Sequence, residues 1–112
     1  MHTQIITAEE LAKLMGEGSA LVLIDLRKDP DYAADPRLLP GAVKRSLSEI
    51  DVWGKTLPQD RPIVVYCDEG KWVGATAVER LRAQGREVRQ MEGGFRAWRA
   101  AGLRLEERGK RP

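Results

Sequence analysis

Cysteine and histidine are nearly absent from the 112 residues of this chain, which has one of each, Cys67 and His2. A single cysteine excludes a disulfide within the chain. A Cys–His catalytic pair needs a histidine near the thiol, and His2 stands at the terminus, far from Cys67 in the sequence. The same scarcity leaves no ligand set for a transition metal. We therefore expect no metal site and no cofactor.

Long apolar runs and a strong net charge are also missing. No apolar segment approaches the roughly 20 residues that span a membrane, and the first residues lack the charged and apolar regions of a signal peptide. The formal net charge is +2, which is too small to indicate a nucleic-acid partner. We therefore expect a cytoplasmic protein with a reduced thiol, with neither a membrane nor a nucleic acid as partner.

The composition is that of a globular domain, with 42% hydrophobic and 32% charged residues. A chain of this length suits one domain with one core, so residues 1–112 are expected to form a single unit. Residues 104–112 are mostly charged, and we expect them to fray as a solvated tail.

Segments typical of strands alternate with segments typical of helices. Apolar or β-branched runs predict strands at 21–26, 43–47, 63–66 and 87–91. Capping signals or helical spacing of apolar residues predict helices after Thr7, after Ser48, at 75–81 and at 95–101. This alternation predicts an α/β fold whose parallel sheet has helices on both faces.

Cys67 stands between the most apolar predicted strand and the helix that follows it. In an open α/β sheet, ligands bind at the edge formed by the carboxyl ends of the strands. Free backbone N–H groups and the helix dipole at that edge favour a negative charge, and a thiolate is such a charge. This placement favours a reactive Cys67. The alternative interpretation is that Cys67 is a small buried hydrophobe.

Four sequence signals, in this order and spacing, resemble those of single-domain rhodaneses, which are sulfurtransferases. The signals are Leu23–Arg27, Leu39–Ala42, Ile63–Cys67 followed by Gly70, and Gly93–Phe95 with Trp98. The resemblance covers nearly the whole chain. It implies a single rhodanese-like α/β domain with a central parallel sheet of about five strands.

The resemblance also implies a chemistry. In that family the cysteine takes a sulfane sulfur from a donor such as thiosulfate or a persulfide, becomes a persulfide, and passes the outer sulfur to cyanide or a thiol. Cys67 matches this cysteine, and the loop that follows it supplies the expected substrate-binding residues. These are Asp68, Glu69, Gly70, Lys71 and Trp72. The loop is expected to curl so that its N–H groups stabilise the anionic sulfur, and Gly70 permits the tight curl.

The loop departs from the family pattern in its charges. Asp68 and Glu69 stand where basic or small polar residues are usual, and they are expected to oppose an anionic donor unless they point to solvent. Lys71 is either a donor-binding cation or an exposed solubilising residue. Trp72 replaces a basic or small hydroxyl residue, and it either walls the pocket or packs under the loop. Related phosphatases and arsenate reductases have an arginine where this chain has Val73, so we disfavour those activities.

Asp25 and Arg27 follow another predicted strand and allow two interpretations. Either they lie beside the thiol, or they support the site indirectly by anchoring the following loop through a salt bridge and backbone hydrogen bonds. We favour the second. The predicted function is a sulfurtransferase with a small-molecule donor and acceptor, or with a sulfur-accepting protein. The alternative function is a sulfur-carrier or protein-binding module without turnover.

Overall fold

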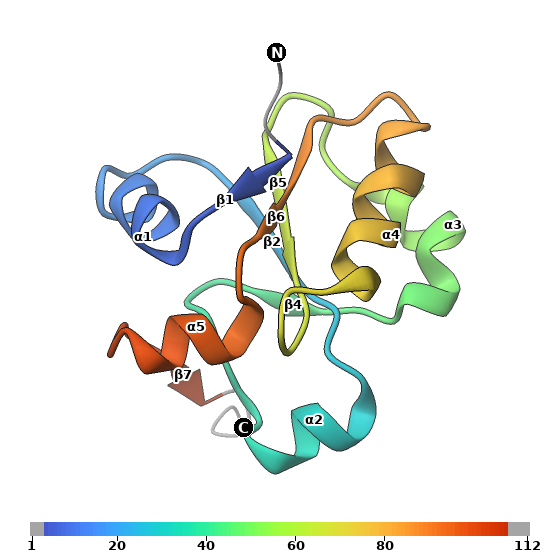
Figure 1. The fold of residues 1–112 in the computed structure, drawn as a ribbon. Helices are drawn as coiled ribbons and strands as arrows, with labels where there is room; N and C mark the ends of the chain where they lie inside the picture. Colours follow the sequence, from blue (N-terminus) through green and yellow to red (C-terminus); the bar gives the residue numbers. More distant parts are fainter. Residues whose placement is uncertain (1–3, 108–112) are drawn as a thin grey trace.

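Five parallel strands form the central sheet of the computed structural model, which describes residues 4–107 (Figure 1). Along the sheet their order is β1 (Ile5–Ile6), β6 (Val88–Met91), β5 (Ile63–Tyr66), β2 (Val22–Asp25) and β4 (Val43–Lys44). The helices are α1 (Ala8–Gly16), α2 (Asp29–Ala34), α3 (Ile50–Trp53), α4 (Trp72–Arg82) and α5 (Gly94–Ala100), with the short 3-10 helices η1 (Leu47–Glu49) and η2 (Gly54–Thr56). The predicted α/β class and five-stranded parallel sheet are confirmed.

The central position of β5 follows from its composition. All four of its residues are buried, three of them are β-branched, and a strand that is covered on both faces favours this kind of apolar run. β5 pairs with β2 on one side and with β6 on the other, with Val65 opposite Ile24 and Gln90. The carboxyl ends of β2 and β5 therefore meet at one edge of the sheet.

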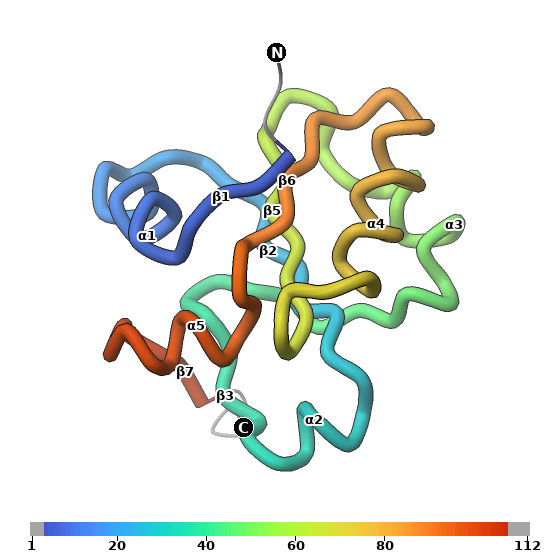
Figure 2. Tube along the Cα trace, viewed as in Figure 1, coloured from blue at the N-terminus to red at the C-terminus, as the bar shows by residue number. Residues whose placement is uncertain are grey.

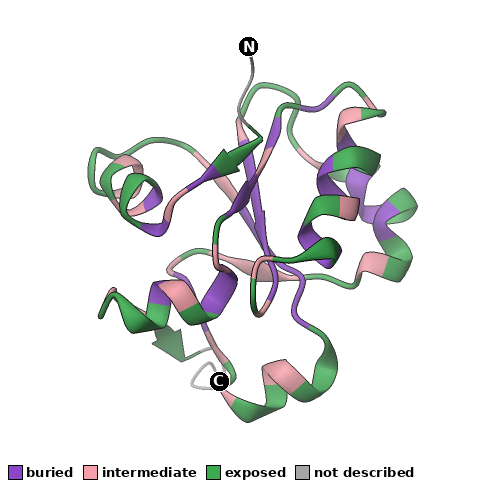
Figure 3. Ribbon diagram, viewed as in Figure 1, coloured by how far each residue is buried: buried purple, intermediate pink, exposed green. Residues whose placement is uncertain are grey.

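Helices cover both faces of the sheet, as predicted (Figures 1 and 2). On one face α3 and α4 pack against alternate residues of β2 and β5, through Ile50, Trp53, Ala77, Val78 and Leu81. On the other face α1 and α5 pack against the remaining residues of these strands through Leu11, Phe95 and Trp98. Figure 3 shows the buried positions concentrated in the sheet and on the inner sides of these helices.

Two helix starts test the predicted capping signals. At α1 the capping box is present, because Glu10 N–H donates to Thr7 Oγ1 at 3.0 Å and Thr7 N–H donates to Glu10 Oε1 at 2.9 Å. The predicted helix that runs through Trp53 is present as α3, but its predicted cap, Ser48, is wrong. The turn begins earlier, as η1, and its cap is Ser46, whose hydroxyl oxygen accepts from the Ser48 N–H at 3.3 Å.

The expected frayed tail is wrong for residues 104–107. There β7 (Glu106–Glu107) pairs antiparallel with β3 (Arg37–Leu38), and Trp98 Nε1–H donates to the Arg104 carbonyl oxygen at 2.8 Å. Leu103 and Leu105 pack against the core on the α5 face, and their burial offsets the cost of ordering this charged segment. The remaining residues of that prediction, 108–112, lie outside the described part of the chain.

Across residues 4–107, none of the helices has the length and apolar character that a membrane crossing requires.

Candidate active site

Cys67 lies at the carboxyl edge of the sheet, in the loop between the end of β5 at Tyr66 and the start of α4 at Trp72. The residue is 6% exposed and lines a cavity of about 270 Å³. The other side chains that line the cavity are Leu26, Lys28, Asp31, Asp68, Glu69, Lys71, Trp72, Val73 and Arg96. The structure thus brings Cys67 and four of the five predicted substrate-binding residues around one cavity. The fifth, Gly70, shapes the loop.

The start of α5 holds the Cys67 loop through backbone hydrogen bonds. Phe95 N–H donates to the Cys67 carbonyl oxygen at 2.8 Å, and Arg96 N–H donates to the Asp68 carbonyl oxygen at 3.1 Å. These bonds satisfy N–H groups that a helix start leaves without partners inside the helix. They also fix the carbonyl groups of the two residues that carry and follow the thiol.

Glycines make this close approach possible. Gly70 has φ +73°, and a Cβ there would lie 2.5 Å from the Gly93 nitrogen. Gly94 has φ +63°, and a Cβ there would overlap the Cys67 carbonyl oxygen and lie 2.6 Å from the Gly70 nitrogen. Both positions combine a left-handed backbone with backbone atoms as neighbours, so any side chain would push the loop and α5 apart. The expected role of Gly70 in a tight curl agrees with this geometry.

Gln90 supports the far end of the loop from β6. It is 7% exposed, and its Nε2–H donates to the Lys71 carbonyl oxygen at 2.9 Å, just before α4 begins. Its side chain packs under Gly74, where a Cβ would lie 2.7 Å from Gln90 Nε2. The start of α4 is thus fixed by a buried amide.

Arg96 neutralises the acidic residues of the loop. Its Nε lies 2.7 Å from Asp68 Oδ2 and its Nη1 lies 3.0 Å from Glu69 Oε2. Lys71 Nζ adds a longer contact of 3.5 Å to Glu69 Oε1. The hydrogen bond to Asp68, together with the two carboxylate charges, raises the pKa of Arg96 above its ordinary value. Both acidic residues thus line the cavity as members of ion pairs, and Glu69 is also exposed to solvent.

Trp72 forms part of the cavity wall and does not pack under the loop. Its side chain is 64% exposed, and Lys28 Nζ lies 5.5 Å from the centroid of its ring. An ammonium group above an indole face is attracted by the ring quadrupole. Trp72 and Lys28 thus contact each other and together form one side of the cavity that holds the thiol.

Comparison with known proteins identifies the family. The family model of the rhodanese-like domain matches residues 7–101. The chain belongs to the rhodanese-like family. Among relatives it is 36% identical over 91% of its length to an HTH-type transcriptional regulator from Mycobacterium tuberculosis, and 30% identical over 83% to a tRNA sulfurtransferase from Desulfurococcus amylolyticus. It spans 44% and 17% of those two proteins.

Relatives of similar size are also found. The chain is 28% identical over 88% of its length to a sulfurtransferase from Allochromatium vinosum, of which it spans 90%. The crystal structure of a rhodanese-like domain protein from Staphylococcus aureus superposes with a TM-score of 0.79 at 26% identity, covering 95% of this chain and 99% of that one. A rhodanese-related protein from Thermoplasma volcanium has a TM-score of 0.78 at 24% identity over 91% of this chain and 96% of its own.

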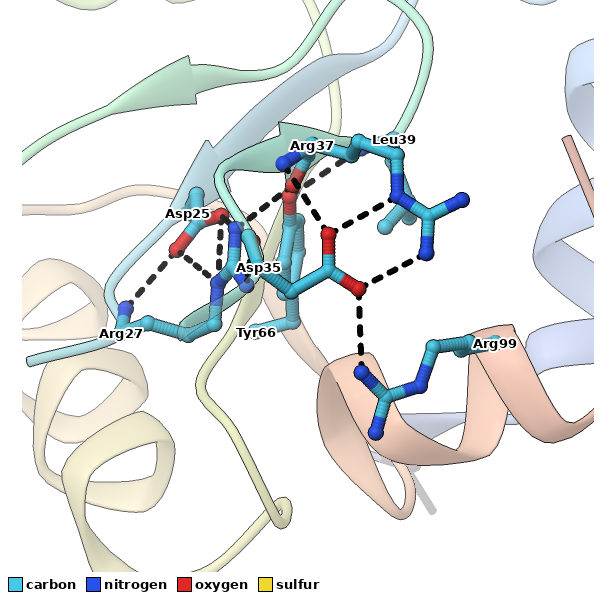
Figure 4. A network of polar contacts seen from close by, with 7 residues as sticks. All are labelled: Asp25, Arg27, Asp35, Arg37, Leu39, Tyr66 and Arg99. Carbon is cyan, nitrogen blue, oxygen red and sulfur yellow. Dashed lines mark hydrogen bonds and ion pairs between the residues drawn. The ribbon is translucent and has the colours of Figure 1, made fainter. Parts of the chain in front are cut away.

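In this rhodanese-like domain Asp25 and Arg27 form a buried ion pair of 2.8 Å outside the cavity of Cys67 (Figure 4). Arg27 Nη1 and Nη2 donate to the carbonyl oxygens of Asp35 and Arg37, both at 2.7 Å. The interpretation that the pair anchors the following loop is confirmed. The Arg27 guanidinium also lies 3.8 Å from the centroid of the Phe95 ring, in the residue that donates to the Cys67 carbonyl oxygen.

Further polar contacts in Figure 4 fix the same loop to the sheet and to α5. The Tyr66 hydroxyl oxygen accepts from the Leu39 N–H at 3.3 Å, and burial raises the pKa of Tyr66. Asp35 pairs with Arg37 at 2.8 Å and with Arg99 at 3.0 Å. The hydrogen bond from Arg37 is the main cause of a strongly lowered pKa for the Asp35 carboxyl group, and the hydrogen bond from Arg99 lowers it further.

Sequence reasoning missed Arg96 and Gln90. A signal for Arg96 was present, since Gly93–Phe95 belongs to the family pattern and residue 96 follows it directly. Gln90 had a weaker signal, a neutral polar residue in the middle of a predicted strand. Within residues 4–107, the acidic, cysteine and histidine side chains form no cluster of three that would suit a metal ion.

Proposed function

We propose that this rhodanese-like domain is a sulfurtransferase in which Cys67 carries sulfur as a persulfide. The observation that supports it best is the position of the thiol. Cys67, the one cysteine of the chain, opens on a cavity at the ligand-binding edge of the sheet, in a loop fixed at both ends by hydrogen bonds from α5 and from Gln90. A nucleophile that is held rigidly beside a cavity is suited to group transfer.

The proposed reaction has two displacement steps. In the first, the Cys67 thiolate attacks the sulfane sulfur of thiosulfate or of a persulfide. The donor S–S bond breaks, and sulfite or a thiolate leaves with the electron pair. In the second, cyanide or a thiolate attacks the outer sulfur of the Cys67 persulfide, whose S–S bond breaks to regenerate the thiolate. Sulfur moves at the oxidation level it had in the donor, so no external oxidant or reductant is needed.

The loop residues have distinct proposed roles. Gly70 gives the curl that exposes backbone N–H groups to the anionic sulfur, and Trp72 walls the cavity. Lys71 stands at the cavity rim with a side chain that is 77% exposed, where it helps to attract an anionic donor. The described side chains that line the cavity carry three cationic and three acidic groups, so a dianion gains no net attraction there. The cavity is therefore expected to bind a singly charged persulfide donor at least as well as thiosulfate.

Intact-protein mass spectrometry tests the first step. After incubation with thiosulfate, or with a small-molecule persulfide, the wild-type protein is expected to gain the mass of one sulfur atom, and Cys67→Ser to gain none. Thermal unfolding of Cys67→Ser checks that the variant is folded. A loaded protein that then returns to its original mass on addition of cyanide or a thiol completes the cycle. Wild-type turnover by Cys67→Ser would contradict the persulfide mechanism.

A second candidate function is a module that binds or carries sulfur without turnover. It is favoured by the relative from Mycobacterium tuberculosis, because the sequence identity with that transcriptional regulator covers only 44% of its chain. In that case Cys67 would take up sulfur in the same mass experiment, but cyanide and small thiols would not remove it at a catalytic rate.

A further inference from the structure

A second cavity adjoins the one that holds Cys67. Its volume is about 250 Å³, and it shares Leu26, Lys28, Trp72 and Val73 with the first. Its far side is formed by the end of β4 and by the segment around η1, which contribute Lys44, Ser46, Leu47 and Ser48. Trp72 and Lys28 therefore stand where the two cavities meet, and a ligand that passes Trp72 reaches both.

The second cavity differs from the first in its charge. Among the described residues that line it, Lys28 and Lys44 are opposed by Asp29, while the Arg27 charge is already matched by Asp25. With Arg27 matched in this way, the second cavity has by its own lining one more cation than acidic residues, with Lys28 shared between the two cavities. Lys44 Nζ also lies 5.6 Å from the centroid of the Tyr32 ring, a contact that restrains the ammonium group.

Hydroxyl groups and an apolar wall complete the second cavity. Ser46 Oγ and Ser48 Oγ lie 2.8 Å apart at the η1 side, and both residues are exposed. Leu47 faces the cavity together with the residues shared with the first. Ammonium and hydroxyl groups suit a carboxylate, and the apolar wall suits a short carbon chain.

We infer that the second cavity binds the carboxylate-bearing tail of a low-molecular-weight thiol while its sulfur reaches the Cys67 persulfide in the first. This inference rests on the proposed sulfur transfer. Thiosulfate and cyanide are too compact to need a second cavity, whereas an acceptor thiolate must approach the outer sulfur in line with the S–S bond. A tail held beyond Trp72 orients that approach. The thiolate attacks the outer sulfur, the Cys67 Sγ–S bond breaks, Cys67 leaves as a thiolate, and the acceptor becomes a persulfide.

Matched thiols test the tail site in single-turnover transfer. Protein loaded with sulfur from thiosulfate and then desalted is mixed with 3-mercaptopropionate or with neutral 2-mercaptoethanol, at equal thiolate concentrations and low ionic strength. The readout is the ratio of the two second-order rate constants. Lys44→Gln is expected to lower this ratio roughly two- to fivefold, the effect of one partly exposed ion pair.

Arg45→Gln is the matched control. Arg45 is the neighbour of Lys44, is exposed, and is not among the described residues that line either cavity, yet its substitution changes the net charge equally. The ratio is expected to stay at the wild-type value in Arg45→Gln. If Arg45→Gln lowers the ratio as much as Lys44→Gln, or if neither lowers it, the second cavity does not bind the tail.

Succinate tests the same site without sulfur transfer. Trp72 is the exposed tryptophan among three, since Trp53 and Trp98 are buried, so fluorescence that is lost in Trp72→Phe reports on the junction of the cavities. Succinate is expected to change this fluorescence, with an affinity about two- to fivefold weaker in Lys44→Gln than in Arg45→Gln. Equal affinity in the two variants, or no change with succinate, overturns the inference. If Cys67 accepts no sulfur, the proposed function fails and the succinate result still decides the tail site.

Discussion

Replacing Gly94 by alanine tests whether the start of α5 holds the Cys67 loop in its working position. The new Cβ would overlap the Cys67 carbonyl oxygen and lie 2.7 Å from the Asp68 carbonyl carbon. Because both are backbone atoms, no side chain can turn aside to make room, and the loop or the helix must shift. Gly102, two residues after the end of α5, is the matched control. It has φ +73°, and no heavy atom of a described residue lies within 4 Å of a Cβ placed there.

Both substitutions are expected to lower the stability of the fold, through one effect that they share and others that only Gly94→Ala has. Each places a Cβ on a left-handed backbone, which costs roughly 1–2 kcal/mol. Gly94→Ala must also relieve the overlap, at about 1–3 kcal/mol for overpacking. It further weakens the hydrogen bond from Phe95 to Cys67, a contact of 2.8 Å that is worth about 0.5–1.5 kcal/mol. At about 4 °C per kcal/mol for a domain of this size, Gly102→Ala should lower Tm by roughly 4–8 °C and Gly94→Ala by roughly 10–25 °C.

The effect on sulfur transfer should separate the variants more sharply. Misplacing a reacting group by about 1 Å costs roughly 100-fold in rate. Relief of the Gly94 overlap needs several tenths of an ångström, so at least a tenfold loss of kcat/KM is expected. Gly102→Ala should stay within about twofold of the wild-type value, since Gly102 lies at the opposite end of α5 from the loop.

Circular dichroism gives the two Tm values, and transfer from thiosulfate to cyanide gives kcat/KM at a temperature where both variants are folded. Equal losses of Tm in the two variants, with wild-type kcat/KM in both, would show that α5 does not position the thiol. If Gly94→Ala fails to fold, Gly70→Ala is used in its place. Its Cβ would lie 2.5 Å from the Gly93 nitrogen, so it presses on the start of α5 from the loop side, and it is compared with Gly102→Ala.

Three further predictions concern charge. Asp68→Asn combined with Glu69→Gln leaves the neighbouring cations uncompensated, so kcat/KM for thiosulfate should rise several-fold at low ionic strength and little at high; an unchanged value at low salt would contradict the charge balance of the cavity. Lys71→Ala should lower the same kcat/KM by less than the double substitution raises it, because the Lys71 side chain is 77% exposed. Asp35→Asn should lower Tm at neutral pH, and the difference from wild type should shrink as pH falls below about 4. The reason is that folding lowers the pKa of Asp35 below its ordinary value of 3.8. The ionised carboxylate therefore stabilises the folded state at pH values above this ordinary pKa, and the stabilisation is lost as the carboxyl group protonates. Asp51→Asn, which breaks an exposed pair of the same 2.8 Å length, should change Tm little at any of these pH values.

The parts of the fold that the sequence predicts well are those set by local pattern. The β-branched run of β5 and the capping box at Thr7 each leave a signal within a few residues. The order of strands and helices then restricts the sheet to a parallel arrangement, and the position of Cys67 at its carboxyl edge follows. No long-range information is needed for these steps.

The ion pairs that the acidic loop residues form were not predictable from local sequence. Arg96 lies 28 residues from Asp68 in the sequence, on a different element, and pairs with it because Gly93 and Gly94 let α5 start against the loop. The order of segment 104–107 also depends on a contact with a distant part of the chain. Its mostly charged sequence predicts a solvated tail, but its pairing with β3 depends on where the 35–38 segment lies. Contacts between distant segments override a local tendency when they bury apolar neighbours such as Leu105.

The contact of Arg27 with Phe95 connects two motifs that are far apart in the sequence. Arg27 is 1% exposed, and a buried charge needs every polar atom satisfied. Asp25 and two loop carbonyl oxygens meet that need, and the face of the guanidinium is left to stack on the Phe95 ring at 3.8 Å. The Phe95 N–H in turn donates to the Cys67 carbonyl oxygen. The ion pair is therefore connected to the backbone of Cys67 through Phe95, although neither Asp25 nor Arg27 is among the described residues that line the cavity of Cys67. If Cys67 carries sulfur as proposed, this connection gives a physical reason for the two motifs to occur together.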